Sequence, residues 1–217
     1  EAVHIDQVTI LFTDFKGFTA VSEVVTPRQL VHDLHECFSA FDRICEKHGI
    51  EKIKTIGDAY MAAGGLPTPN TTHATDAIKA ALEMRDFIAE GKVRKVAAGL
   101  PYFEIRIGIH TGPVVAGIVG LKKFQYDIWG DTVNTASRME SSGEVGQVNI
   151  SEATYRLVKD AKRVNGEWSI ANGGDSGSTA HSPFTNSHSP AFTFTPRGKV
   201  QAKGKGEMEM YFVSRSL

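Results

Sequence analysis

Hydrophobic and polar positions follow two different periods along this chain. After Pro27, apolar residues return every three or four positions as far as Cys45, which predicts a helix with one buried face. Residues 73–88 have the same spacing and predict a second helix. Residues 8–13 are β-branched and aromatic, and residues 50–56 alternate apolar with polar side chains, so both stretches predict strands.

Turn residues separate the next elements. A glycine and Asp58 interrupt the strand pattern before it resumes at residues 59–63, which predicts a hairpin with Asp58 at its turn. Residues 103–109 and 114–119 predict two more strands, with a turn between them at residues 110–113, where a glycine and a proline stand together.

The last part of the chain returns to helices before a final strand. A third helix is expected to begin near Asp131, whose side chain suits the N-cap position. A short helix at residues 153–159 and a strand at residues 208–213 complete the order. This order predicts an α+β fold: a ferredoxin-like βαββαβ core sheet with helices on one face, followed by a C-terminal subdomain or hairpin.

One segment, residues 172–190, breaks these patterns. It is rich in Gly, Ser, Asn and Pro and has no apolar period, which indicates a flexible insertion at the surface. The length of 217 residues suits a single domain, so we expect one domain over residues 1–217 that carries this insertion.

Composition narrows the class of protein. A formal net charge of −1 gives no reason to expect nucleic-acid binding. No stretch approaches the roughly 18 consecutive apolar residues of a membrane-spanning helix. Cys37 and Cys45 fall within a helical pattern rather than a disulfide framework, so we expect a reduced, cytoplasmic setting for this domain.

Two aspartates stand where a predicted strand meets a glycine-containing turn. Asp14 ends the first strand, and Asp58 lies at the hairpin turn. Two strand-end carboxylates from neighbouring strands could hold a pair of divalent cations, since Mg²⁺ prefers carboxylate oxygens. The alternative is that each aspartate only caps a turn.

Two further stretches suit a phosphorylated ligand. Asn134 and Arg138 lie four apart on the third helix and share a face, so an amide and a guanidinium could together orient a ribose and neutralise phosphate charge. Lys203 opens a Lys-Gly-Lys-Gly run in which backbone and ammonium groups could approach a polyphosphate. Taken alone, the alternatives are a solvated helix face and an exposed basic turn.

Three isolated residues indicate a function less clearly. Taken singly, Lys54 is interpreted as a solvent-facing lysine of a strand and Asp127 as an aspartate of a loop. His110 suits a general base, but we interpret it as a structural histidine because nothing near it in sequence orients it.

Five stretches, in order, resemble the catalytic domain of the class III adenylate and guanylate cyclases. They are residues 8–19 (VTILFTDFKGFT), 52–61 (KIKTIGDAYM), 105–117 (IRIGIHTGPVVAG), 126–139 (YDIWGDTVNTASRM) and 196–206 (PRGKVQAKGKG). The likeness covers nearly the whole chain, and residues 172–190 depart from it.

The resemblance implies a role for eight residues. These are the metal ligands Asp14, Asp58 and the Phe15 carbonyl, the purine-binding Lys54 and Asp127, the ribose-orienting Asn134, the α-phosphate-binding Arg138 and the terminal-phosphate-binding Lys203. It further implies two divalent cations, Mg²⁺ or Mn²⁺, and a homodimer in which one chain supplies the metal ligands and the other chain supplies the remaining residues.

The purine-binding pair favours ATP. Adenine offers N1 as an acceptor and its N6 amino group as a donor, whereas Lys54 can only donate and ionised Asp127 can only accept. Guanine reverses this edge, and guanylate cyclases of the resembled family have Glu and Cys at these two places. The resemblance therefore implies an adenylate cyclase that makes cyclic AMP from ATP.

Three alternatives stay open or are set aside. One is a guanylate cyclase or a cyclase of mixed specificity, and another is a non-catalytic partner in a heterodimer. A diguanylate cyclase is set aside because the Gly-Gly pairs are not followed by that family's acidic signature. We also expect an upstream regulatory or sensor domain in the full-length protein, whose attachment to a membrane is open.

Overall fold

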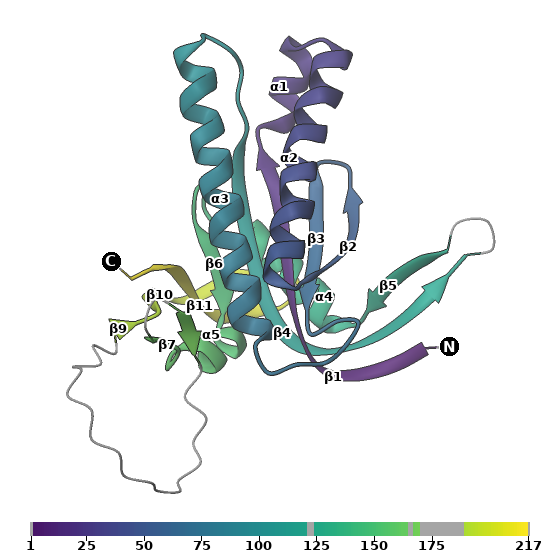
Figure 1. Ribbon diagram of the computed structural model, residues 1–217, viewed down its shortest axis with the longest axis vertical. Helices are drawn as coiled ribbons and strands as arrows, with labels where there is room; N and C mark the ends of the chain where they lie inside the picture. Colours follow the sequence, from purple (N-terminus) through teal and green to yellow (C-terminus); the bar gives the residue numbers. More distant parts are fainter. Residues whose placement is uncertain (1, 121–123, 165–166, 170–188, 217) are drawn as a thin grey trace, which may run out of the picture.

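The computed structural model describes residues 2–120, 124–164, 167–169 and 189–216, and its centre is a mixed β-sheet (Figure 1). In this described part the sheet has eight strands, in the order β10-β11-β6-β4-β1-β3-β2, with β5 paired to β4. The strands are β1 (Ala2–Lys16), β2 (Glu51–Ile56), β3 (Ala59–Gly64), β4 (Glu104–Val119), β5 (Gln125–Trp129), β6 (Val148–Ser151), β10 (Phe192–Ala202) and β11 (Gly206–Arg215).

The connections confirm the predicted core. The described helices are α1 (Phe18–Val24), α2 (Pro27–His48), α3 (His73–Ala97), α4 (Asp131–Ser141) and α5 (Glu152–Val158). The run β1-α2-β2-β3-α3-β4 forms the antiparallel order β4-β1-β3-β2, which is the ferredoxin-like βαββαβ arrangement. The β10–β11 hairpin extends the sheet beyond β6 and supplies the expected C-terminal hairpin.

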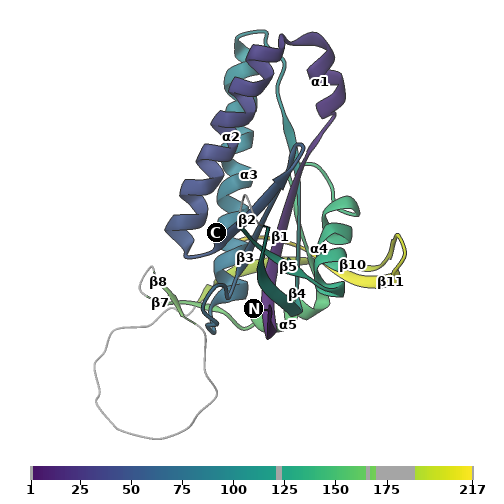
Figure 2. The same ribbon diagram turned by 90° about the vertical axis from the view of Figure 1, so that its right-hand side faces the viewer.

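Successive residues of β1 point to opposite faces of the sheet, and each face has its own core. Leu11 and Phe15 pack with α2 and α3 in the larger cluster, whereas Val8, Ile10 and Phe12 pack on the other face, in a cluster that includes Ala136 of α4. Figure 2 shows α2 and α3 on one side of the sheet and α4 on the other. The expectation of helices on one face therefore holds for α2 and α3, while α4 covers the opposite face.

Helix α4 lies against β4 with no space between their backbones. A Cβ atom added to Gly108 of β4 would lie 1.9 Å from the backbone nitrogen of Glu140. Three hydrogen bonds hold the helix there. Thr132 donates to the Pro113 carbonyl at 2.6 Å, Asn149 donates to the Met139 carbonyl at 2.8 Å, and Arg197 of β10 donates at 2.8 Å to the carbonyl of Ser142, the C-cap of α4. The position of α4 is thus fixed at both ends.

The predicted turn at residues 110–113 is wrong, because β4 runs without interruption from Glu104 to Val119. The register of β1 against β4 shifts between Ile5 and Val8, so two residues of β1 oppose the single residue Pro113. A proline lacks the N–H that a regular ladder needs, and a bulge is where a strand tolerates that loss.

Other differences concern the ends of elements. The structure adds α1, β5, β6 and β7 (Lys162–Val164) with β8 (Glu167–Ser169), none of which the pattern predicted, and α3 continues beyond residue 88. Gly130, not Asp131, is the N-cap of α4, and no side-chain cap bond forms there. The expected insertion at residues 172–190 lies outside the described residues up to residue 188, and its last two residues form β9 (Ser189–Pro190), paired with β7.

Substituting Gly108 with alanine should displace α4. Because backbone atoms rather than flexible side chains occupy the space, we expect Gly108→Ala to lower the free energy of unfolding by about 3 kcal/mol or more, measured by denaturant titration. Gly91→Ala in α3 is the matched control, since the nearest atom there is 3.8 Å away and belongs to a side chain. Equal stability of the Gly108 variant and the native protein would contradict the packing described here.

Candidate active site

The two aspartates come together because their strands are neighbours. Asp14 lies near the end of β1, and Asp58 lies in the turn between β2 and β3, of which β3 pairs with β1. Burial, followed by the hydrogen bond and the negative charge of Asp58, raises the pKa of Asp14 to about 6. A pair of adjacent carboxylates that repel one another is a donor set of hard oxygens, and it fits a divalent cation.

Two charged residues that sequence reasoning missed complete this cluster. Arg106 of β4 lies opposite Asp14 in the ladder, and its Nη2 is 3.5 Å from Oδ2 of Asp14. Its Nε donates to Oε1 of Glu140 on α4 at 3.0 Å. Burial is the largest cause that raises the pKa of Glu140, Arg106 lowers it, and the charges of Asp14 and Asp58 raise it; together they bring the pKa to about 7. Only the register of β1 against β4 reveals this grouping, and that register is not readable from one sequence.

The third predicted metal ligand is Phe15, and packing of its aromatic ring holds this residue in position. The ring is buried and stacks on Phe103 with centroids 4.6 Å apart. This packing fixes the backbone next to Asp14, and the backbone carbonyl is the only oxygen that Phe15 offers.

Lys54 and Asp127 form an ion pair. Lys54 lies on β2 and Asp127 on β5, and Nζ of the lysine is 2.6 Å from Oδ2 of the aspartate. The other carboxylate oxygen of Asp127 accepts the backbone N–H of Ile128 at 2.8 Å. The loop position expected for Asp127 taken singly is therefore wrong: it is a strand residue and is only 9% exposed.

The helix α4 presents Asn134 and Arg138 on its accessible face. Asn134 is exposed and Arg138 is half-buried, whereas Thr135, Ala136 and Met139 between and beside them are buried against the sheet. The spacing of four residues thus places both side chains on one face, as predicted.

Lys203 lies in the turn between β10 and β11 and is exposed. Its neighbour Lys205 forms an ion pair with Asp131, the first residue of α4. Among the residues that the structure describes, no hydrogen bond or ion pair engages Lys203. The hairpin turn is thus fastened to α4 by one lysine, while the other faces solvent.

His110 is held by a polar chain inside the sheet. Its Nδ1 lies 2.7 Å from the hydroxyl of Ser151 on β6. Burial lowers the pKa of His110 to about 4, with Asp131 acting in the opposite direction and Lys205 in the same direction. The imidazole is therefore neutral at pH 7, which agrees with a structural role.

In the structure, the predicted site residues fall into separate groups. The described contacts join Asp14 with Asp58 and, separately, Lys54 with Asp127, whereas Asn134 and Arg138 share the α4 face. Within the described residues, no hydrogen bond or ion pair joins the aspartate pair to Lys54, Asp127, Asn134, Arg138 or Lys203. Arg106 and Glu140 connect the aspartates to the end of α4.

Comparison with known proteins identifies the family. A model of the adenylate and guanylate cyclase catalytic domain matches residues 1–215. The chain is 39% identical over 209 residues to the guanylate cyclase soluble subunit beta-2 of Rattus norvegicus and 36% identical over 208 residues to an adenylate cyclase of Mycobacterium tuberculosis, and each alignment covers 96% of this chain. The structure matches that of the adenylyl cyclase CyaB from P. aeruginosa with a TM-score of 0.80 and 27% identity, over 100% of this chain and 97% of that one. This chain belongs to the adenylate and guanylate cyclase catalytic domain family.

The matched relatives are longer proteins. The chain covers 26% of the rat subunit and 39% of the mycobacterial cyclase. In the described part of the chain, none of the helices combines the length and the apolar character that crossing a bilayer requires.

His110 makes the stability of the fold sensitive to acid. Its folded pKa of about 4 lies below the ordinary histidine value of 6.5, so the unfolded chain takes up the proton first. The stabilisation is complete above pH 6.5 and is lost as the pH falls towards 4, by about 3 kcal/mol at most. His110→Gln should therefore lose less unfolding free energy between pH 6.5 and 4 than the native protein, measured by denaturant titration. Parallel curves for the two proteins would contradict the neutral, buried imidazole.

Proposed function

We propose that this domain is an adenylate cyclase that converts ATP into 3′,5′-cyclic AMP and pyrophosphate. The observation that carries the proposal is the ion pair of Lys54 and Asp127, which sets a donor beside an acceptor at 2.6 Å. The Watson–Crick edge of adenine has the complementary order of acceptor and donor.

Guanine at the same place would face the wrong groups. Its O6 accepts and its N1–H donates, so a guanine in the adenine position would set donor against donor and acceptor against acceptor. Unpaired polar groups in a site cost free energy, and sites built on such contacts discriminate by large factors. The buried backbone bond to Asp127 keeps this carboxylate in place and so supports the preference for ATP.

The remaining residues supply binding and charge. In the reaction a bond forms between the ribose 3′-oxygen and the α-phosphorus, the bond to pyrophosphate breaks, and the proton of the 3′-hydroxyl is released. Asn134 orients the ribose, Arg138 neutralises the charge that grows on the α-phosphate, and Lys203 binds the terminal phosphates.

Asp14, Asp58 and the Phe15 carbonyl would hold two divalent cations, Mg²⁺ or Mn²⁺. Such cations acidify the attacking hydroxyl and screen the phosphate charge. The close carboxylates of Asp14 and Asp58 support this assignment, because their mutual repulsion is relieved by a cation.

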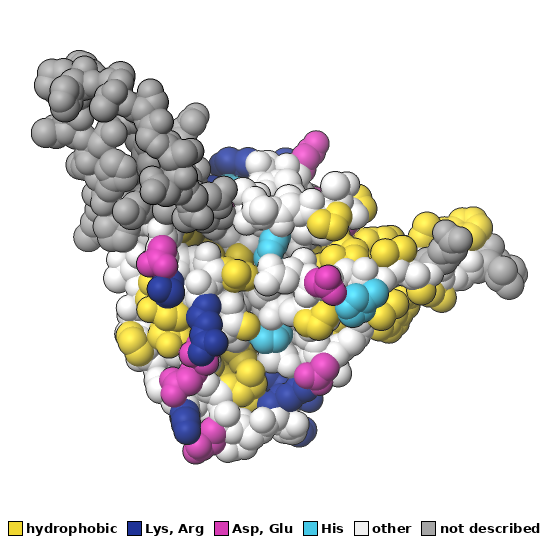
Figure 3. Space-filling view, turned by 90° about the horizontal axis from the view of Figure 1, so that it is seen from below, with side chains coloured by type: hydrophobic (Ala, Val, Ile, Leu, Met, Phe, Trp, Pro, Cys, Tyr) yellow, Lys and Arg dark blue, Asp and Glu magenta, His cyan; other side chains and the backbone are white. Residues whose placement is uncertain are grey.

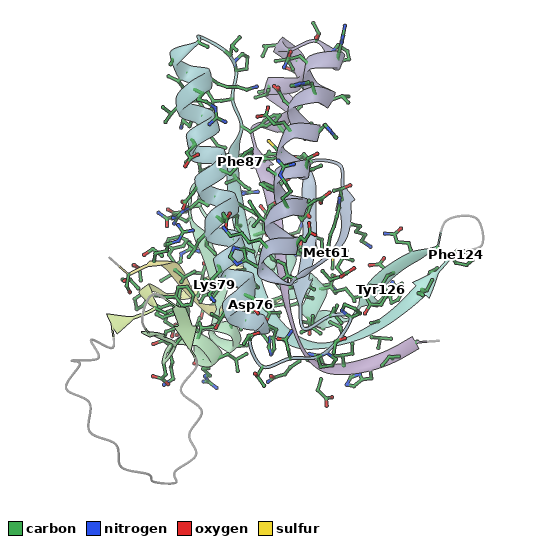
Figure 4. All side chains as sticks on the ribbon, viewed as in Figure 1. Met61, Asp76, Lys79, Phe87, Phe124 and Tyr126 are labelled. Atoms are coloured by element: carbon green, nitrogen blue, oxygen red, sulfur yellow. The ribbon has the colours of Figure 1, made fainter. Side chains whose placement is uncertain are left out.

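We further propose that the active form is a homodimer with two shared sites. The start of β1, the end of β4 and β5 form an arm that reaches away from the helices (Figure 1). Figure 3 shows apolar side chains gathered along this arm. Ile118, near the end of β4, is 62% exposed. Phe124 lies at the far end of the arm and Tyr126 nearer to the sheet (Figure 4), and Phe124 is 78% exposed. An apolar surface of this kind supports a partner chain that covers it.

A guanylate cyclase is the second candidate. The identity of 39% with a guanylate cyclase subunit, against 36% with an adenylate cyclase, favours neither nucleotide by itself. The two candidates differ in which nucleotide the purified chain consumes.

The purified chain should therefore make cyclic AMP from ATP in the presence of Mg²⁺ or Mn²⁺. With GTP supplied separately, we expect a kcat/KM at least about tenfold lower, because guanine mismatches the Lys54–Asp127 pair. Specific activity should fall on dilution if the sites are shared between chains. Preferential formation of cyclic GMP would overturn the ATP assignment, and absence of both products from a folded dimer would contradict catalysis by this chain alone.

Exchanging the purine-binding pair should move the preference towards GTP. For the double substitution Lys54→Glu and Asp127→Cys, we expect kcat/KM for ATP to fall about a hundredfold and activity with GTP to rise. Lys52→Glu is the matched control, because Lys52 lies on the same strand and pairs with Asp42 instead. Loss of ATP activity without any gain with GTP would show that these two residues alone do not determine the preference.

A further inference from the structure

A half-buried ion pair, between Arg106 and Glu140, lies beside the two aspartates. The side chain of Arg106 is 20% exposed and that of Glu140 is 10% exposed. Among the described residues, Arg106 is the one cationic side chain paired with Asp14, and it is also the one paired with Glu140. Because a buried charge without a partner is costly, the two acids share one cation.

The guanidinium lies closer to Glu140 than to Asp14. The contact with Glu140 is a hydrogen bond of 3.0 Å, whereas the nearest approach to Asp14 is 3.5 Å. Glu140 cannot retreat from this contact, because its backbone touches β4 at Gly108. The position of α4 therefore sets how far Arg106 is drawn from Asp14.

We propose that Glu140 is a positioning residue that holds Arg106 away from Asp14 and so leaves Asp14 available to a divalent cation; this inference rests on the proposed metal role of Asp14. Two effects act in the same direction. Without the Glu140 carboxylate, Arg106 has Asp14 as its remaining partner and competes with the metal. The cluster also loses one negative charge, which weakens its attraction for a cation.

The count of charges makes the proposal specific. With all groups ionised, Asp14, Asp58 and Glu140 contribute three negative charges and Arg106 one positive charge. Glu140→Gln removes a negative charge and frees Arg106, whereas the double substitution Arg106→Gln and Glu140→Gln removes one charge of each sign and leaves the net charge of the cluster unchanged.

The test measures binding of Mn²⁺ to the full chain without nucleotide, from the free-Mn²⁺ signal in electron paramagnetic resonance at pH 8. We expect the Kd of Glu140→Gln to rise about tenfold, the Kd of the double variant to return to within about threefold of the native value, and Arg106→Gln to bind at least as tightly as the native chain. Thermal unfolding of each variant confirms that it is folded.

A structural role for the pair predicts a different order. If Glu140 only held α4 in place, removing Arg106 as well would not restore binding, and a double variant as weak as Glu140→Gln would overturn the proposal. An unchanged Kd in Glu140→Gln would also overturn it.

Asp58→Asn is the control for the metal site itself, and we expect it to abolish the Mn²⁺ binding of the native chain. If the native chain bound no Mn²⁺, or if Asp58→Asn bound it as well as the native chain, the proposed metal role of the aspartates would fail, and the inference with it. A native chain that binds, together with a Glu140→Gln variant that binds equally, would remove the inference alone.

Discussion

The antiparallel ladder between β1 and β4 determines where the other parts of the molecule lie. It runs from the first residues of β1 to Lys16, and it accommodates Pro113 through a bulge instead of ending there. One end of the ladder sets Asp14 opposite Arg106, and the other end forms the exposed arm with β5. Both faces of the ladder are covered, by α2 and α3 on one side and by α4 on the other. A single pairing register thus connects the aspartate cluster with the surface proposed to meet a second chain.

The sequence could predict those parts of the fold that depend on residues close together in the chain. The stripe of apolar residues in α2 and the turn at Asp58 depend on local spacing, and both are confirmed. The turn expected at residues 110–113 is wrong, because local turn propensity ignores the long partner strand that pairs with β4 on both sides of this point. The strand β5 was missed for the same reason, since it exists only by pairing with β4.

The candidate site divides in the same way. Resemblance to a family gave the predicted roles of its residues. The structure shows what spacing alone could not show: Lys54 and Asp127 are in contact although 73 positions separate them. Arg106 and Glu140 escaped notice because each looks like an ordinary charged residue, on a strand and at the end of a helix. What distinguishes Arg106 and Glu140 is their burial and their contact with one another, and neither can be read from the local sequence.

The ion pair of Lys54 and Asp127 also changes how selection of a base is understood. The two groups satisfy one another in the structure, so a base that binds between them, as proposed here, must replace this bond. Binding of a base at such a place is an exchange: contacts with the base replace the bond between the two side chains. A base with the wrong order of donor and acceptor meets no steric barrier, yet it offers each partner less than the partner already has. If the proposed purine site lies here, the protein's own bond sets the free energy that any base must supply. A stronger internal pair would weaken the binding of every base by the same amount and leave the difference between two bases unchanged.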